Sequence, residues 1–343
     1  MKVSVLVTAA AVLALNVVAP AAQAQHLNPV IDLLVGKKQV FGLYAPSNPR
    51  VGGGRGGRGG PPGAPVTPPP VDTTTRKTPG ELAKVAVTNT SSDFIFNGDM
   101  EGNFDGAYTT WVDFARGMAT AEPATKAKRG HPLFVKTPEI APNPTLAAER
   151  IVKQLNTGVM GIVMVGVESA EEVRQGIAAM RFKSKGGNRP DAVGDAPAAW
   201  GLSEKEYKDR ADLWPLNPKG ELVNMVIVES KEGLAHLDEI AAVPGISILV
   251  PGAGTLGGVM VKMGADGKPI LDANGRPERD PVAWEASIQQ ILAACKKNKL
   301  PCGYPSGEAN IEQRIKEGFS VHIVNWGETG FKVVDMGRKI GGR

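Results

Sequence analysis

The sequence lacks a strong excess of charge of either sign. Its 343 residues include 39 Lys and Arg against 35 Asp and Glu, a net charge of +4. Nucleic-acid-binding proteins generally concentrate basic residues, so this balance argues against such a partner. Beyond residue 24 the chain also lacks an apolar run long enough to cross a bilayer, so we expect no membrane span.

Cysteine is scarce, because Cys295 and Cys302 are the two in the chain. The C-x6-C spacing by itself is a poor indicator of a metal site. In an oxidising compartment the pair would form a disulfide that stabilises the fold by roughly 2–3 kcal/mol. Two buried free thiols are the alternative.

The first 24 residues have the pattern of a secretory signal peptide. Lys2 precedes an apolar stretch from Val3 to Val18, and Ala22-Gln23-Ala24 forms a small-x-small cleavage site. A membrane anchor is the alternative, but it needs about 20 strongly apolar residues. The sequence therefore predicts cleavage after Ala24, one mature domain over 25–343, and a periplasmic or secreted protein.

Glycine and proline are abundant, with 42 and 27 residues. Many lie in two segments, 46–79 and 257–281. The first has almost no large apolar side chain, so we expect a flexible insert. The second contains Asp266-Gly267 and Asn274-Gly275 and resembles a surface β-hairpin. Both follow predicted strands, which would place them on one face of the fold.

The rest of the chain alternates between short apolar runs and helical patterns. Eight strands are predicted at 39–44, 93–97, 132–136, 161–167, 222–228, 246–250, 300–304 and 320–325. Helices between them begin at capping signals such as Ser169 and Asn143-Pro144. This alternation predicts an α/β fold, a TIM (β/α)8 barrel. A doubly wound sheet is the alternative, but no Gly-x-Gly-x-x-Gly follows the first strand.

Polar and aromatic residues gather where the predicted strands end, the face on which TIM barrels build active sites. A carboxylate there can bind a hard divalent cation or transfer a proton. Glu168 is followed by its own capping box, which favours a helix-capping role for it. The candidates are Asn97, Asp99, Glu101, Lys136, Glu168, Glu229, Gly252 to Thr255, Tyr304 and Trp326.

Three segments carry a family resemblance: GIVMVGVESAEEVRQGIAAMRF, VIVESKEGLAHLDEIAAVPGISILVPGAGTL and EQRIKEGFSVHIVNWG. On these, the chain resembles the HpcH/HpaI-type aldolase and citrate lyase β-subunit superfamily. The resemblance implies a TIM barrel, usually a homo-oligomer, that cleaves or forms carbon–carbon bonds of 2-oxo acids or acyl thioesters. It also implies Mg2+ or Mn2+, which polarises a carbonyl group and stabilises an enolate.

The signature positions of that family are only partly retained. Glu229 falls on the metal-binding Glu, whereas Thr255 lies nearest the place of the expected Asp ligand. Asn97-Gly98-Asp99-Met100 replaces D-G-E-H, and Met100 cannot carry a proton as His does. Lys136 stands for an Arg and keeps its charge without the bidentate fork.

Two hypotheses follow from this pattern. In the first, an exported lyase acts on a small carboxylate substrate with Lys136, Asp99 and Asn97 as catalytic residues, and Glu229, Thr255 and Glu168 as metal ligands. Its predicted substrate-binding residues are Gly252, Ala253, Gly254, Thr255, Tyr304 and Trp326. In a variant, Lys136 forms a Schiff base. In the second hypothesis, the barrel mouth binds a small carboxylate or a protein partner without catalysis.

Overall fold

The computed structural model describes residues 26–48, 76–123 and 129–343. The predicted signal peptide and most of the first Gly/Pro-rich insert lie outside these residues. Among the described helices, none is long and apolar enough to cross a membrane.

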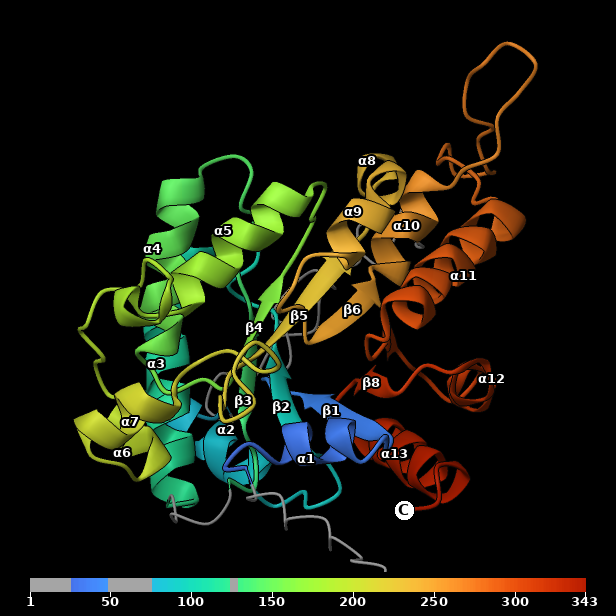
Figure 1. The fold of residues 1–343 in the computed structure, drawn as a ribbon. Helices are drawn as coiled ribbons and strands as arrows, with labels where there is room; N and C mark the ends of the chain where they lie inside the picture. Colours follow the sequence, from blue (N-terminus) through green and yellow to red (C-terminus); the bar gives the residue numbers. More distant parts are fainter. Residues whose placement is uncertain (1–25, 49–75, 124–128) are drawn as a thin grey trace, which may run out of the picture.

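Eight parallel strands form one curved sheet in the order β6-β5-β4-β3-β2-β1-β8-β7 (Figure 1). The two outer strands approach each other, because the Leu249 N–H donates to the Pro301 carbonyl at 3.1 Å. The sheet is thus a nearly closed barrel, which confirms the predicted TIM-like fold. The strands are β1 (Val40–Tyr44), β2 (Phe94–Asn97), β3 (Leu133–Lys136), β4 (Gly161–Met164), β5 (Val223–Val228), β6 (Ile248–Pro251), β7 (Gly303–Pro305) and β8 (Val321–Val324).

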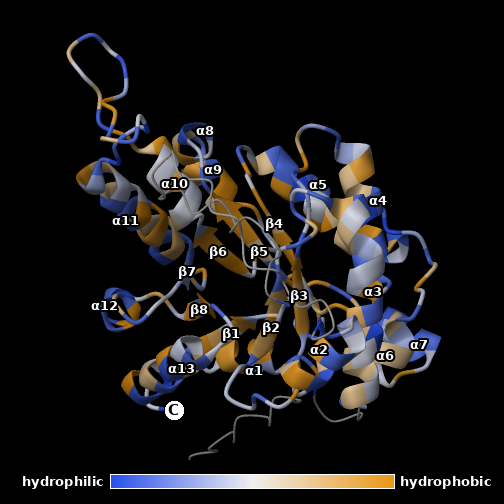
Figure 2. Cartoon of the chain, turned by 180° about the vertical axis from the view of Figure 1, so that it is seen from behind, coloured by the Kyte–Doolittle hydropathy of each residue, from blue (hydrophilic) through white to orange (hydrophobic). Residues whose placement is uncertain are grey.

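Helices surround the sheet and present their apolar faces to it (Figure 2). Many begin at the residue that the sequence signals, as where the Asn143 side chain accepts from the Leu146 N–H. They are α1 (Pro29–Val35), α2 (Pro79–Ala86), α3 (Phe104–Ala121), α4 (Pro144–Leu155), α5 (Ala170–Met180), α6 (Ala196–Trp200), α7 (Glu204–Arg210), α8 (Lys231–Ala235), α9 (Leu237–Ala241), α10 (Ala253–Val259), α11 (Pro281–Asn298), α12 (Ile311–Glu317) and α13 (Glu328–Ile340).

Large and small residues alternate across the inside of the barrel. Phe41 packs outward against α12 and α13, so Gly42, the next residue, faces inward. A Cβ on Gly42 would lie 2.0 Å from the Phe94 ring, and one on Gly161 would lie 2.3 Å from the Phe134 ring. The two rings are 4.6 Å apart at their centroids. They fill the barrel and leave chemistry to its rim.

Both ends of the described chain are fastened near the amino ends of strands. The Asn28 N–H donates to Glu221 at 3.0 Å, just before β5. At the other end, Arg343 contacts both carboxylate oxygens of Asp93 at 2.7 and 2.8 Å, just before β2. These contacts lie opposite the carboxyl ends, where the predicted site is.

The second insert projects from the barrel between α10 and α11 (Figure 1). The structure corrects the expected single hairpin to two small hairpins in succession. Antiparallel bridges join Met263 to Pro269 and Leu271 to Pro277. Gly267 and Gly275 have φ angles of +74° and +73° at the two turns, which confirms the DG and NG turn positions.

Candidate active site

Lys136 ends β3, and its ammonium group lies at the carboxyl rim of the barrel. The Nζ atom is 2.8 Å from Glu101 Oε2, and the Lys136 side chain is 14% exposed. Gly98 lies beside its aliphatic stem, with Tyr44 nearby. The Gln154 side chain holds the Lys136 carbonyl at 2.8 Å. These contacts fix a single positive charge at the rim.

Glu229 follows β5 and occupies the neighbouring part of the rim. Its Oε1 accepts from the Gly166 N–H at 3.1 Å, and Thr255 also forms a hydrogen bond with it. Gly252 must be glycine here, because a Cβ would lie 2.3 Å from a Glu229 carboxylate oxygen. Burial raises the pKa of Glu229, and Thr255 and Lys136 partly oppose this effect.

These side chains form one group, which we call the mouth cluster: Lys136, Glu101, Glu229 and Thr255. Lys136 and Glu101 both act electrostatically on Glu229. The cluster combines a cation, a carboxylate bound to it, and a half-buried carboxyl group that can gain or lose a proton. Such a set can bind a small carboxylate and stabilise negative charge that develops beside it.

The donor chemistry of the mouth cluster does not fit a protein-held divalent cation. Glu229 supplies one carboxylate, Thr255 supplies a neutral hydroxyl, and Glu101 is bound to Lys136. Mg2+ needs near-octahedral oxygen ligands, and a neighbouring ammonium group opposes a second cation. Within the described residues no group of three His, Cys, Asp or Glu could hold a metal ion.

Glu168, the third predicted ligand, is held through its backbone at the start of α5. Its N–H donates to Glu172 Oε1 at 3.3 Å, and its carbonyl contacts His236 Nδ1 at 2.9 Å. The structure brings Glu229 and Thr255 together but shows no contact of Glu168 with either. The local capping box that follows Glu168 explains this placement.

The predicted catalytic pair Asn97 and Asp99 is also displaced from the mouth cluster. The Asn97 side-chain amide donates to Asp99 at 3.0 Å, and both residues line a separate hollow that includes Trp111. Met100 is buried beside Gln154. The acid that reaches Lys136 is therefore Glu101, two residues beyond Asp99.

Two predicted aromatic residues have structural neighbours. Tyr304 is 2% exposed and lies under Arg314, whose guanidinium is 4.5 Å from the ring centroid. Strand alternation turns this side chain outward toward Arg314, and its contact with substrate stays a prediction. Trp326 packs edge-on against Phe331 of α13, and its role in binding stays a prediction.

The residues of the loop after β6 lie in two different places. Gly252 and Thr255 face Glu229. Ala253 and Gly254 line a second hollow beneath the projecting insert. The Ala253 carbonyl accepts from the Trp284 indole at 2.8 Å. The substrate-binding prediction therefore retains contact with the mouth cluster at Gly252 and Thr255 only.

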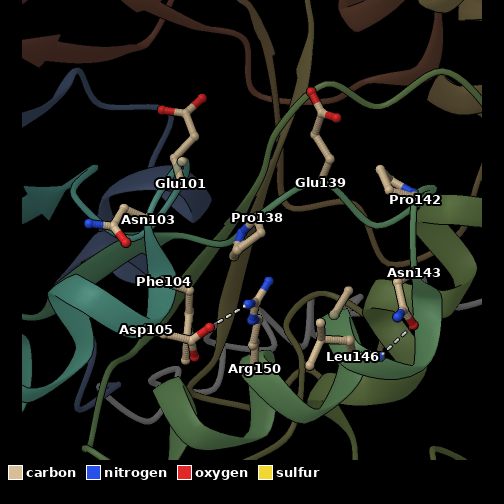
Figure 3. Close-up of a pocket in the computed structure, with 12 residues that line it drawn as sticks. Glu101, Asn103, Phe104, Asp105, Pro138, Glu139, Pro142, Asn143, Leu146 and Arg150 are labelled. Carbon is tan, nitrogen blue, oxygen red and sulfur yellow. Dashed lines mark hydrogen bonds and ion pairs between the residues drawn. The ribbon is translucent and has the colours of Figure 1, made fainter.

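Sequence reasoning missed one acidic residue beside the mouth cluster, Glu139. A Cβ on Gly166 would lie 2.9 Å from Glu139 Oε1, and Gly166 is the backbone donor to Glu229. Figure 3 shows Glu139 and Glu101 on the same side of a cavity, opposite Arg150. The signal for Glu139 in the sequence is its position three residues after Lys136, in the loop that follows β3.

The barrel and its polar rim define an α/β protein whose site lies at the carboxyl ends of the strands. Residues 119–335 match the HpcH/HpaI aldolase/citrate lyase family. The chain belongs to this family, as its sequence resemblance implied.

Two curated aldolases are similar to part of the chain. A 2-dehydro-3,6-dideoxy-6-sulfogluconate aldolase of Pseudomonas putida is 27% identical over 176 residues, which are 50% of this chain and 59% of that protein. A 2-keto-3-deoxy-L-rhamnonate aldolase of Escherichia coli is 31% identical over 154 residues, covering 45% and 51%. The chain spans about half the length of these relatives.

A solved structure supports the fold over a longer range. An HpcH/HpaI aldolase/citrate lyase family protein from Burkholderia cenocepacia has a TM-score of 0.59 and 19% identity, covering 91% of this chain and 96% of that one. At this identity the likeness shows the fold alone.

Proposed function

We propose that the protein is an exported carbon–carbon lyase of the aldolase type that acts on a small 2-oxo or hydroxy acid. The observation that carries the proposal is the Lys136 ammonium, held by Glu101 at the barrel rim beside the half-buried carboxyl group of Glu229. A 2-oxo acid has a carboxylate and a carbonyl oxygen, and a fixed positive charge such as the Lys136 ammonium can bind either group.

The cleavage step uses these groups directly. The Glu229 carboxylate takes the proton of the substrate hydroxyl, and the hydroxyl-bearing carbon becomes an aldehyde as the carbon–carbon bond breaks. The bond's electron pair passes to the 2-oxo half as an enolate, whose oxygen faces the Lys136 ammonium. Return of the proton to the enolate carbon releases the 2-oxo acid.

No step here uses the Mg2+ or Mn2+ implied by the family resemblance. Within the mouth cluster, a single unpaired carboxylate beside an ammonium group is a poor donor set for such an ion. Lys136 supplies positive charge where a Lewis acid would otherwise supply it. A Schiff base at Lys136 is less favoured, because its nitrogen is held by the Glu101 carboxylate at 2.8 Å, whereas imine formation needs that nitrogen free to attack a carbonyl carbon.

Exchange of the pyruvate methyl protons with D2O tests the proposal, because it requires only enolate formation. We expect the wild-type protein to catalyse this exchange, measured by proton NMR, and Lys136→Met to lose about 100-fold. Lys153→Met, which removes a charge from the exposed side of α4, is the matched control.

The outcomes separate the hypotheses. Exchange unaffected by Lys136→Met would contradict the assigned role. Pyruvate binding without exchange would favour the non-catalytic alternative. Borohydride treatment with pyruvate should leave Lys136 unmodified, and a covalent adduct there would instead support the Schiff-base variant.

Export is part of the proposal and is supported by the cysteine pair. The structure joins Cys295 and Cys302 in a disulfide, which confirms the pairing expected for an oxidising compartment. Cleavage after Ala24 and periplasmic or secreted location remain proposals. So does a homo-oligomeric state, which the family resemblance implies.

A further inference from the structure

A cavity of about 600 Å³ lies beside the mouth cluster, between the loops that follow β2 and β3 (Figure 3). This volume is within the range of small-molecule sites, about 300–1,000 Å³. We call it the outer cavity. Its walls include the charged residues Glu101, Asp105, Glu139 and Arg150.

Two wall residues connect the outer cavity to the mouth cluster. Glu101 belongs to both, because its carboxylate binds Lys136. Glu139 lies against Gly166, whose N–H binds Glu229. A molecule whose carboxylate is held by Lys136 can therefore extend its other end into the outer cavity.

The charges of the outer cavity leave one carboxylate uncompensated. Glu101 is paired with Lys136, and Asp105 is paired with Arg150 at 2.9 Å. Glu139 is exposed and has no hydrogen bond or ion pair with any other described residue. The field at the junction with the mouth cluster is therefore negative.

We infer that the outer cavity holds the far half of the substrate and that Glu139 is a specificity-determining residue. It accepts hydrogen bonds from the hydroxyl groups of a neutral chain and repels a second anionic group, such as a terminal phosphate. Pro138, Pro142 and Leu146 offer apolar surface to the C–H groups of the same chain. This inference rests on the proposed function for the orientation of the substrate.

Calorimetric titration tests this selectivity without requiring turnover. The probes are a six-carbon 3-deoxy-2-oxo sugar acid and its terminal phosphate ester, titrated into the intact protein. We expect the neutral-ended acid to bind about tenfold more tightly, and Glu139→Gln to narrow the ratio about fivefold. Glu149→Gln, on the exposed face of α4 outside the cavity, should leave the ratio unchanged.

Equal affinities, tighter binding of the phosphate ester, or a ratio unchanged by Glu139→Gln would overturn the inference. Binding of neither compound would overturn it as well. Loss of the proposed lyase activity has a different signature: no exchange of pyruvate protons, while the protein still distinguishes the two probes.

Discussion

At the scale of single residues, Thr255 decides what the mouth cluster can bind. It bonds Glu229 through a neutral hydroxyl, so within the mouth cluster Glu229 is the one carboxylate that is not paired with Lys136. Thr255 at the place of the family's Asp ligand therefore lowers the affinity that we expect of the mouth cluster for a divalent cation. Its neighbour Gly252 leaves the Glu229 carboxyl group uncovered on that side.

The change Thr255→Asp should turn the mouth cluster into a metal site. It places a second carboxylate beside Glu229, and paired carboxylates are the usual protein ligands of Mn2+ and Mg2+. Electron paramagnetic resonance of added Mn2+ should show free ion with the wild type and bound ion with the variant. Thr255→Ser, which keeps a hydroxyl, is the control. Bound Mn2+ in the wild type that is lost in Glu229→Gln would contradict our interpretation.

The sequence predicted the residues of the site less well than the strands that carry them. Lys136 and Glu229 could be predicted because one ends a strand and the other directly follows one. The neighbours of Asp99 and Tyr304 could not, because the turn of a loop and the face of a three-residue strand depend on tertiary packing. Glu101 takes the position at Lys136, and Arg314 covers Tyr304. Neither contact leaves a periodic signal in the chain.

At the scale of elements, short apolar or β-branched runs predicted all eight strands. Helix boundaries are less clear in the sequence where two short helices share one pattern. The helical spacing of apolar residues continues past His236, whereas the structure ends α8 at Ala235 and begins α9 at Leu237. The segment between β4 and β5 contains α6 and α7, which short polar runs did not reveal.

The disulfide between the end of α11 and the start of β7 should contribute roughly 2–3 kcal/mol to the free energy of unfolding. Protein recovered from the periplasm of a bacterial host should have the mass of a chain that begins at Gln25 and lacks two hydrogens. Replacing both cysteines by serine should lower Tm, and reductant should then have no further effect. A mass that retains residues 1–24 would contradict export, and two free thiols would contradict the disulfide.

At the scale of the whole molecule, α13 and Arg343 close the fold. Val333 and Val334 of α13 pack against Phe41 and Leu43 of β1, and Arg343 ends on buried Asp93. The last helix is thus held by its own chain. The ion pair lies far from the mouth cluster, so stability and activity can be tested separately there.

The change Arg343→Ala should lower the free energy of unfolding by about 1–2 kcal/mol, because Asp93 loses a two-point contact while Arg338 remains bound to it. Lys339→Ala removes an exposed positive charge from the same helix and is the control. Urea unfolding followed by circular dichroism gives both values. An equal effect of the two substitutions would show that the Asp93 contact adds nothing.

The aromatic filling of the barrel has a consequence for the order of events in turnover. The Phe94 and Phe134 rings fill the bore below Lys136, and the outer cavity opens beside it. A molecule at Lys136 is therefore reached from the outer cavity and not through the barrel. An aldehyde formed in that cavity stands between the 2-oxo acid and solvent. On the proposed function, the 2-oxo acid is formed at Lys136, deeper in the barrel than the aldehyde. The aldehyde therefore leaves first, and the 2-oxo acid follows.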